Sequence, residues 1–302
     1  SLRWGRIQEA NSVIPDSLVG AESNRRFYSF RGEKVIGSAF GKYFFRPVDR
    51  LAVQGELQVT YRRYRQYDEA FFDRTFRVPY IFANPRIGVT VNPEHALSGY
   101  FSAAYAQREP RLSQLYDADA AGAGAVPQFE RQPDDSFDYD RPLVQPESLL
   151  DFEIGGTLER RRYRLSANVY WMEFWNEIIP SGGIDQLGKP RTGNADRTRH
   201  VGLEVEASAR PLPGWDVSFN STLSRNRLID FTEYVTVDGS TEAIDRSGSP
   251  IAGFPERMAR FRTSYRWNGW RIALDGEFSG KQYIDNSGGT RPDGSPAPER
   301  AV

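Results

Sequence analysis

Hydrophobic and polar residues alternate with a period of two along much of the chain. The pattern is clearest at 201–224, where two alternating arms flank a turn rich in proline and glycine at 211–214. Two such arms joined by such a turn predict a β-hairpin. Each arm has about the 9–11 residues that a tilted strand needs to cross a bilayer. The apolar positions of the two arms are Val201, Leu203, Val205, Ala207, Ala209, Trp215, Val217, Phe219 and Leu223.

The same unit recurs along the chain and predicts about ten strands. We expect them at 35–45, 51–62, 81–91, 97–105, 150–159, 163–175, 201–210, 215–224, 259–267 and 270–278. Pro85 interrupts the third, because proline removes a donor from the ladder. Short turns are predicted near residues 48, 94, 161, 212 and 268, and long loops at about 65–79, 108–145, 180–197, 230–253 and 284–302.

The alternation of short turns with long loops bears on the class of fold. Short turns on one rim and long loops on the other are typical of an outer-membrane barrel, whereas a soluble sandwich turns about every 8–12 residues. Trp215, Trp267 and Trp270 flank short turns, where an interfacial aromatic girdle lies. The pattern therefore predicts an all-β, antiparallel transmembrane β-barrel. Its meander of about ten strands is expected to be an incomplete part of a larger barrel.

Composition adds bounds to this picture. The chain has 302 residues, a net charge of -1, no cysteine, 39% hydrophobic residues and 13% aromatic residues. The charge gives no bulk field that would favour nucleic acid. No run of about 18 apolar residues predicts a transmembrane helix, and no signal peptide opens the chain at Ser1. Both ends look cut from a longer protein, so we expect a fragment.

A series of short segments points to a family. In order they are NPRIGV at 84–89, YAQREP at 105–110 with LYD at 115–117, QPESLLDFEIG at 145–155, NVYWMEF at 168–174 with NEI at 176–178, Asn194 with VGLEVE at 201–206, and GFPER at 253–257. This series resembles the C-terminal part of the barrel of TonB-dependent outer-membrane receptors. The resemblance covers nearly the whole chain. Each segment alone is a weak signal, and their order makes the series fairly specific.

The resemblance implies active import across the outer membrane of a Gram-negative cell. It implies a multi-pass barrel of roughly 22 strands with a plugged lumen. It also implies a small-molecule ligand, often a ferric siderophore or cobalamin, and energy from the inner-membrane TonB complex. The chain shows no plug, no TonB-binding box and no last strand with a terminal aromatic residue. The expected partners are therefore outer-membrane lipid, an iron chelate, and TonB through an N-terminal part outside this chain.

Candidate ligand-binding residues lie on the polar faces of strands near the rim with long loops. Cations and phenols there would suit an anionic ligand such as a catecholate or carboxylate chelate. These side chains could equally pair with each other or with a plug, because lumen residues of barrels are polar. The candidates are Arg62, Tyr64, Arg108, Asn194, His200, Asn226 and Lys281.

No other motif predicts chemistry. The acidic segment 134–140 lacks the central glycine of an EF-hand loop, and His95 and His200 supply too few ligands for zinc. No nucleophile with a base and an orienting group stands out, so neither a cofactor nor an enzyme is expected. Two alternatives stay open at this stage: a passive porin or barrel enzyme of about ten to twelve strands, and a soluble β-rich binding module. The soluble module predicts that Leu203, Val205, Val217 and Phe219 pack against a second sheet.

Overall fold

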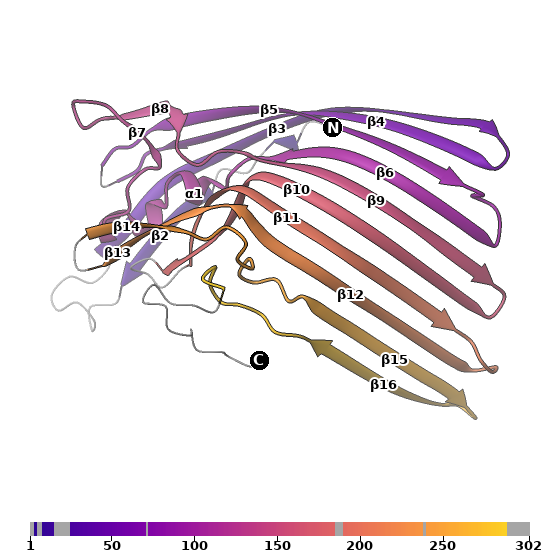
Figure 1. The fold of residues 1–302 in the computed structure, drawn as a ribbon. Helices are drawn as coiled ribbons and strands as arrows, with labels where there is room; N and C mark the ends of the chain where they lie inside the picture. Colours follow the sequence, from indigo (N-terminus) through magenta and orange to yellow (C-terminus); the bar gives the residue numbers. More distant parts are fainter. Residues whose placement is uncertain are drawn as a thin grey trace.

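The chain forms one large curved antiparallel sheet (Figure 1). The computed structural model describes residues 3–4, 8–14, 25–70, 72–184, 190–237 and 240–288. Ten long strands follow one another along the sheet. They are β3 (Arg25–Val48), β4 (Leu51–Tyr67), β5 (Phe76–Val91), β6 (Leu97–Arg108), β9 (Glu147–Arg160), β10 (Tyr163–Ile184), β11 (Pro190–Ala209), β12 (Trp215–Asp230), β15 (Arg257–Trp267) and β16 (Trp270–Ser279).

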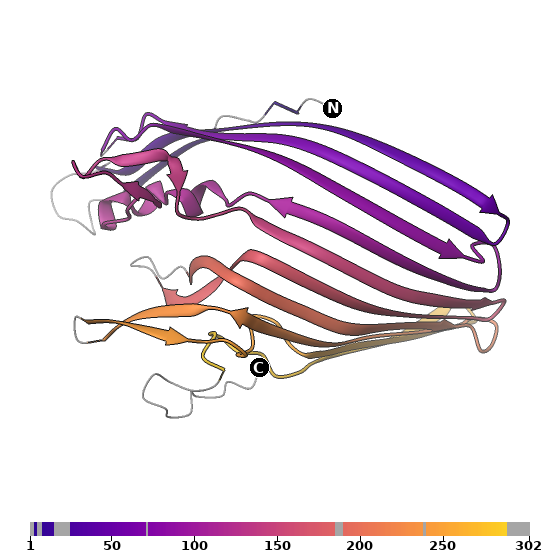
Figure 2. The same cartoon turned by 45° about the horizontal axis from the view of Figure 1, so that its top comes forward.

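The order of the strands confirms the predicted meander. Each long strand pairs antiparallel with the next one, and β1 (Arg3–Trp4) and β2 (Gln8–Ile14) add to β3 at one edge. The other edge is β16, which pairs only with β15 among the described strands. Figure 2 shows the sheet curved around a concave side. The predicted fold class, an incomplete antiparallel barrel, is therefore confirmed.

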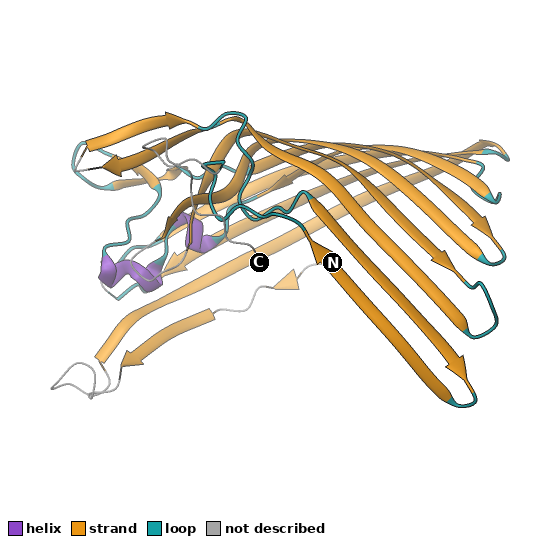
Figure 3. Ribbon diagram, turned by 60° about the horizontal axis from the view of Figure 1, so that its bottom comes forward, coloured by secondary structure: helices purple, strands orange, loops and turns teal. Residues whose placement is uncertain are grey.

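The two rims of the sheet differ. Short turns join the strands at 49–50, 92–96, 161–162, 210–214 and 268–269, and we call this edge the short-turn rim. The opposite edge, the long-loop rim, carries the longer connections (Figure 3). These include α1 (Leu112–Leu115), the 3-10 helix η2 (Ala118–Ala123), and the hairpins β7 (Phe129–Arg131) with β8 (Phe137–Pro142) and β13 (Thr232–Val237) with β14 (Ser240–Asp245).

Several predicted loop boundaries were wrong because the strands run further than their apolar alternation. β4 continues to Tyr67 and β5 begins at Phe76, so the connection predicted at 65–79 is limited to 68–75, and β10 and β11 take up most of 180–197. The loops predicted at 108–145 and 230–253 contain the short elements named above. Of 284–302, only the part up to 288 lies within the described residues. Polar side chains ended the periodicity while the backbone ladder continued.

The convex face of the sheet carries apolar residues in register. Leu203 lies opposite Leu223, Phe219 opposite Phe261, and Trp267 opposite Trp270. Phe219 is 38% exposed and Trp270 is 73% exposed, both without a second layer over them. The further sheets among the described strands are the two small hairpins at the long-loop rim. The soluble-module alternative, which required a second sheet over this face, was therefore wrong.

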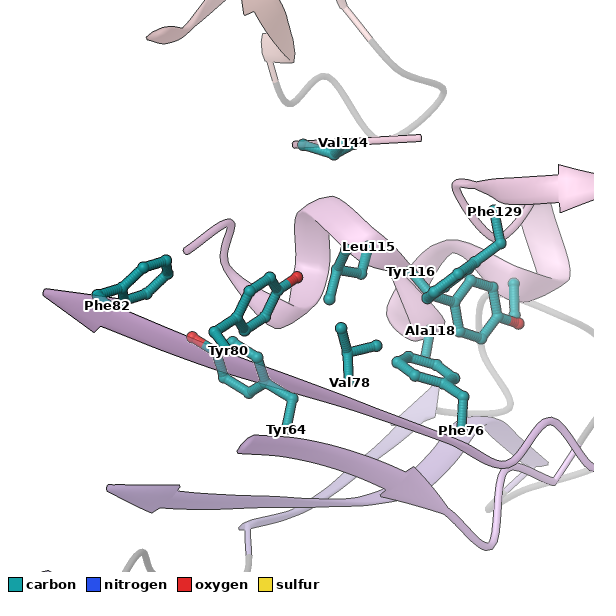
Figure 4. Close-up of a cluster of buried hydrophobic side chains, with 11 residues drawn as sticks. Tyr64, Phe76, Val78, Tyr80, Phe82, Leu115, Tyr116, Ala118, Phe129 and Val144 are labelled. Atoms are coloured by element: carbon teal, nitrogen blue, oxygen red, sulfur yellow. The ribbon is translucent and has the colours of Figure 1, made fainter. Parts of the chain in front are cut away.

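On the concave side, the segment that follows β6 folds back into the curve of the sheet. Figure 2 shows α1 and η2 inside the curve of the sheet. Leu115 and Tyr116 pack onto alternate residues of β5 in a buried cluster, drawn in Figure 4. Arg74 adds to this packing, because its guanidinium donates to the Tyr116 hydroxyl (2.9 Å) and lies 4.2 Å from the centre of the Phe72 ring. The segment therefore rests on the inner wall as a packed structure.

Tyrosine rings lie over glycines across neighbouring strands of the inner wall. Tyr170 is opposite Gly202, and Tyr100 is opposite Gly155. A Cβ atom at Gly202 would lie 2.4 Å from the Tyr170 hydroxyl oxygen, and one at Gly155 would lie 2.6 Å from a Tyr100 ring carbon. A large ring can lie flat on the wall where its cross-strand neighbour has no side chain. These two pairs fix the register in the middle of the sheet.

No helix within the described ranges has the length and apolar character that crossing a membrane would require.

Candidate functional site

Six of the seven predicted site residues lie in or next to three polar groups at the long-loop end of the sheet. The first group is Lys34, Arg62, Tyr64 and Glu109. Lys34 lies opposite Tyr64 in the register and donates to its hydroxyl at 2.8 Å. The carboxylate of Glu109, 2% exposed, receives Arg62 at 2.5 Å and Lys34 at 2.9 Å. Two cations thus share one carboxylate, which leaves this group with a net positive charge.

A further phenol lies beside this first group. Tyr80 is opposite Arg62 across β4 and β5, and its hydroxyl is buried without a hydrogen-bond partner among the described residues. Buried polar atoms nearly always have a partner. The Tyr80 hydroxyl and the surplus cation are therefore the features of this wall that suit an added anionic or oxygen-rich group.

The second group is centred on His200. Its Nδ1 lies 2.8 Å from Asn226 Oδ1, and its Nε2 lies 3.1 Å from Glu177 Oε2. The Thr198 hydroxyl donates to the same carboxylate oxygen. The rings of Phe174 and Phe254 meet the imidazole edge-on, with centroids 5.2 and 5.1 Å away. Glu177, Thr198, His200 and Asn226 are all buried. Their network therefore holds β10, β11 and β12 together near the long-loop rim.

The third group involves residues of β6, β9 and β11. Arg108 forms a bidentate pair with Glu147, with distances of 2.8 Å from Nε and 2.9 Å from Nη2. The side chain of Asn194 holds the segment before β9, because it accepts from the Gln145 amide (2.8 Å) and donates to the Gln145 carbonyl (3.0 Å). Lys281 follows β16, and its ammonium lies 4.9 Å from the centre of the Tyr283 ring.

The structure thus brings Arg62 together with Tyr64, and His200 with Asn226, whereas the contact shown for Lys281 is with Tyr283. Sequence reasoning missed the carboxylates that organise these groups, Glu109 and Glu177. Glu109 follows the last residue of β6. The alternation of inward and outward side chains predicts directions only within a strand, so it could not place Glu109. Glu177 shares its parity with the outward residues Glu173 and Trp175, yet its carboxylate contacts inward side chains. Asn176 adopts a left-handed conformation with φ of 53°, which breaks the alternation between them.

The packing of the segment after β6 changes the ionisation of Tyr116. Burial raises the pKa of the Tyr116 phenol, and the nearby carboxylate of Glu69 raises it further, against the lowering effect of Arg74. The neutral phenol is therefore the stable form in this packing. In the exposed β7–β8 turn, hydrogen bonds from Ser136 hold the pKa of Asp134 below its ordinary value.

Below these groups the inner wall is polar and acidic. A hollow of about 540 Å³ is lined by side chains from β6, β9, β10, β11 and β12, including Glu153, Glu204, Glu206, Asn168 and Asn220. Within the described ranges, no cluster of three histidine, cysteine or acidic side chains has the arrangement to hold a metal ion. Polar atoms on the concave face and apolar residues on the convex face give the sheet two opposite environments.

A single sheet with an apolar outer face, a charged inner wall and inward-folded loops on one rim is the wall of a transmembrane β-barrel. The family model described as "TonB dependent receptor-like, beta-barrel" matches residues 2–300. The chain therefore belongs to the TonB-dependent receptor β-barrel family, whose members are outer-membrane proteins. No curated protein matches it by sequence.

Solved structures share the fold at low sequence identity. The siderophore receptor PiuA from Acinetobacter baumannii is 17% identical with a TM-score of 0.63, over 87% of this chain and 35% of that one. The ferric citrate transporter FecA is 14% identical with a TM-score of 0.64, over 90% and 36%. The copper transporter OprC is 14% identical with a TM-score of 0.62, over 92% and 40%. The chain thus spans about two fifths or less of the length of these proteins.

Proposed function

We propose that this chain is part of an outer-membrane receptor that imports a scarce ligand with energy derived from TonB. The observation that carries the proposal is the opposite chemistry of the two faces of the sheet, with polar groups on the concave face beside the inward-folded loop. Lipid would cover the convex face, and the concave face would line the lumen. The short-turn rim would then lie in the periplasm and the long-loop rim outside the cell.

The ligand class that we favour is an anionic metal chelate, such as a ferric siderophore. Support comes from the first polar group, where Lys34 and Arg62 share Glu109 and the Tyr80 hydroxyl is unpartnered. Guanidinium and ammonium groups bind carboxylate and catecholate oxygens through charge-assisted hydrogen bonds. In this proposal Arg62 and Tyr64 contact ligand directly. Arg108, Asn194, His200, Asn226 and Lys281 complete the surface, and relatives whose names include siderophore and ferric citrate support the class.

The test uses the full-length protein in an outer-membrane host under iron limitation. Uptake of labelled ferric chelates is measured with and without the proton-motive force. We expect saturable uptake that disappears when the force is collapsed. Leakage of small solutes regardless of ligand and energy would indicate a passive porin instead, and absence from the membrane fraction would contradict the whole proposal.

Replacing Arg62 with glutamine tests the site within the same assay. We expect the half-saturating ligand concentration to rise about ten- to a hundredfold, because one charge-assisted hydrogen bond of about 1.5–3 kcal/mol is lost. The maximal rate should change little. Arg46→Gln is the matched control, since Arg46 pairs with Glu94 at the opposite rim. Equal effects of the two substitutions would contradict a ligand contact at Arg62.

A further inference from the structure

Two arginines on the convex face have no carboxylate partner among the described residues. Arg65 on β4 and Arg77 on β5 lie directly opposite each other in the register, and both are exposed. The Arg65 guanidinium lies 4.6 Å from the centre of the Tyr67 ring. Arg77 has no hydrogen bond or ion pair with any described residue. Like charges directly opposite each other destabilise a sheet, so this pair is unfavourable unless an anion joins it.

Two acidic residues near this pair, Glu33 and Asp68, have other partners. Glu33 lies opposite Arg65 in the register, but its carboxylate accepts from Arg63 at 3.0 Å. Asp68 pairs with Arg31 at 3.3 Å. Among the described residues, these two carboxylates are thus paired with other arginines, and neither neutralises the two adjacent guanidinium groups.

The side of the sheet on which the pair lies follows from β5. Phe76 and Val78 are buried against α1 and η2 on the concave side (Figure 4), whereas Arg77 between them is exposed. Arg77 therefore points from the convex face, together with Ile81, which is 73% exposed. This is the face that carries the apolar band.

The height of the pair follows from the length of the apolar band. On β4 the outward apolar positions run from Leu51 to Tyr61, which is about 33 Å along a strand at about 3.3 Å per residue. With a tilt of about 40°, this distance spans about 25 Å across the membrane, the usual height of the apolar band of a barrel. Arg65 lies four residues beyond Tyr61 on the same strand, and Arg77 is its partner on β5. Both therefore stand beyond the apolar band, at the level of the lipid headgroups.

We propose that Arg65 and Arg77 together bind a phosphate group of an anionic lipid in the leaflet on the long-loop side. Phosphate oxygens can accept charge-assisted hydrogen bonds from both guanidinium groups at once. An anion between them also removes the repulsion across the strands. A contrasting cluster lies on the same face at β10 and β11, where Arg197 and Arg199 both bind Glu173 and need no external anion. The inference rests on the membrane placement in the proposed function.

The test measures lipid binding by the full-length protein, purified in mild detergent and stripped of lipid. The probes are bisphosphorylated lipid A, dephosphorylated lipid A and inorganic phosphate. For the double variant Arg65→Gln/Arg77→Gln we expect about a thirtyfold loss of affinity for bisphosphorylated lipid A. The matched control is Arg131→Gln/Arg141→Gln, which removes two exposed arginines with acidic partners on the β7–β8 hairpin at the same rim. This control should bind as the wild type does.

The outcomes separate this inference from the proposed function. Unchanged affinity in the double variant would overturn the lipid site, as would equal binding of dephosphorylated lipid A. Saturation by inorganic phosphate at the same concentrations as lipid A would reduce the pair to a general anion site and also overturn it. Heat-modifiable migration on a gel checks that each variant is folded, and the single variant Arg77→Gln should give an intermediate loss. Energy-dependent uptake should persist in the double variant, because the lipid site takes no part in ligand binding. A wild-type protein that binds lipid A but shows no energy-dependent uptake would contradict the proposed function and leave the lipid site standing.

Discussion

Arginine in place of Phe219 is expected to destabilise the membrane-inserted protein by about 2–4 kcal/mol. Phe219 lies midway along the apolar part of β12, with Ala207 on one side and Phe261 on the other. It points from the convex face and is 38% exposed. A guanidinium at this depth would have to leave water for hydrocarbon, and no acidic residue of the neighbouring strands faces it from that side.

The control is the next residue, Asn220, which points to the concave wall and lines the acidic hollow. Asn220→Arg should change the free energy of unfolding much less, because a hydrated wall with Glu204 and Glu206 accommodates a cation. Both variants are compared by urea titration of the full-length protein in phospholipid vesicles. Equal losses at the two positions would contradict the assignment of the two faces.

The second large effect is expected from Glu177→Ala, with a loss of about 2–4 kcal/mol. Glu177 is buried, and its carboxylate serves both the Thr198 hydroxyl and His200 Nε2. Its removal leaves two buried polar groups unpaired, and each such group costs about 1–3 kcal/mol. The upper ends of β10 and β11 would loosen as a result, and with them the position of His200 and Asn226.

Glu206→Ala is the matched control for this substitution. Glu206 is an exposed carboxylate on the concave wall of β11, with no hydrogen bond or ion pair to any described residue. Its loss should change the free energy of unfolding by no more than about 0.5 kcal/mol. Glu177→Gln should recover part of the stability, because an amide oxygen can still accept one bond. A Glu177→Ala variant as stable as the Glu206→Ala variant would show that the network is not structural.

Most of the fold could be predicted from the sequence, for a specific physical reason. A strand between lipid and a polar lumen must alternate, and the hydrophobic period therefore marked all ten long strands and their short turns. Where strands rise above the apolar band, nothing forces the alternation, and the extensions of β4, β5, β10 and β11 were read as loops. The short helices of residues 112–123 were also missed, because they are too short to show a helical period.

The candidate site was only partly predictable. The alternation of inward and outward residues correctly placed Arg62, Tyr64, His200 and Asn226 on the polar face near the long-loop rim. It gave no access to Glu109, which lies in a loop, or to Glu177, whose direction depends on the left-handed conformation of Asn176. Asparagine tolerates the left-handed conformation better than most residues. Asn176 within a predicted strand is therefore the sequence signal that could have indicated a break in the alternation before Glu177. Whether these residues touch a ligand stays a prediction.

One measurement tests the two-faced sheet most directly. Single spin labels are placed at successive positions 216 to 222 of β12 in the full-length protein reconstituted in lipid vesicles, and collisions with oxygen and with a water-soluble nickel chelate are recorded. We predict a strict period of two, with oxygen collisions highest at 217, 219 and 221 and fewest at the inward positions between them. Uniform exposure to the nickel chelate, or protection at every position, would contradict the placement of this sheet between lipid and a polar lumen.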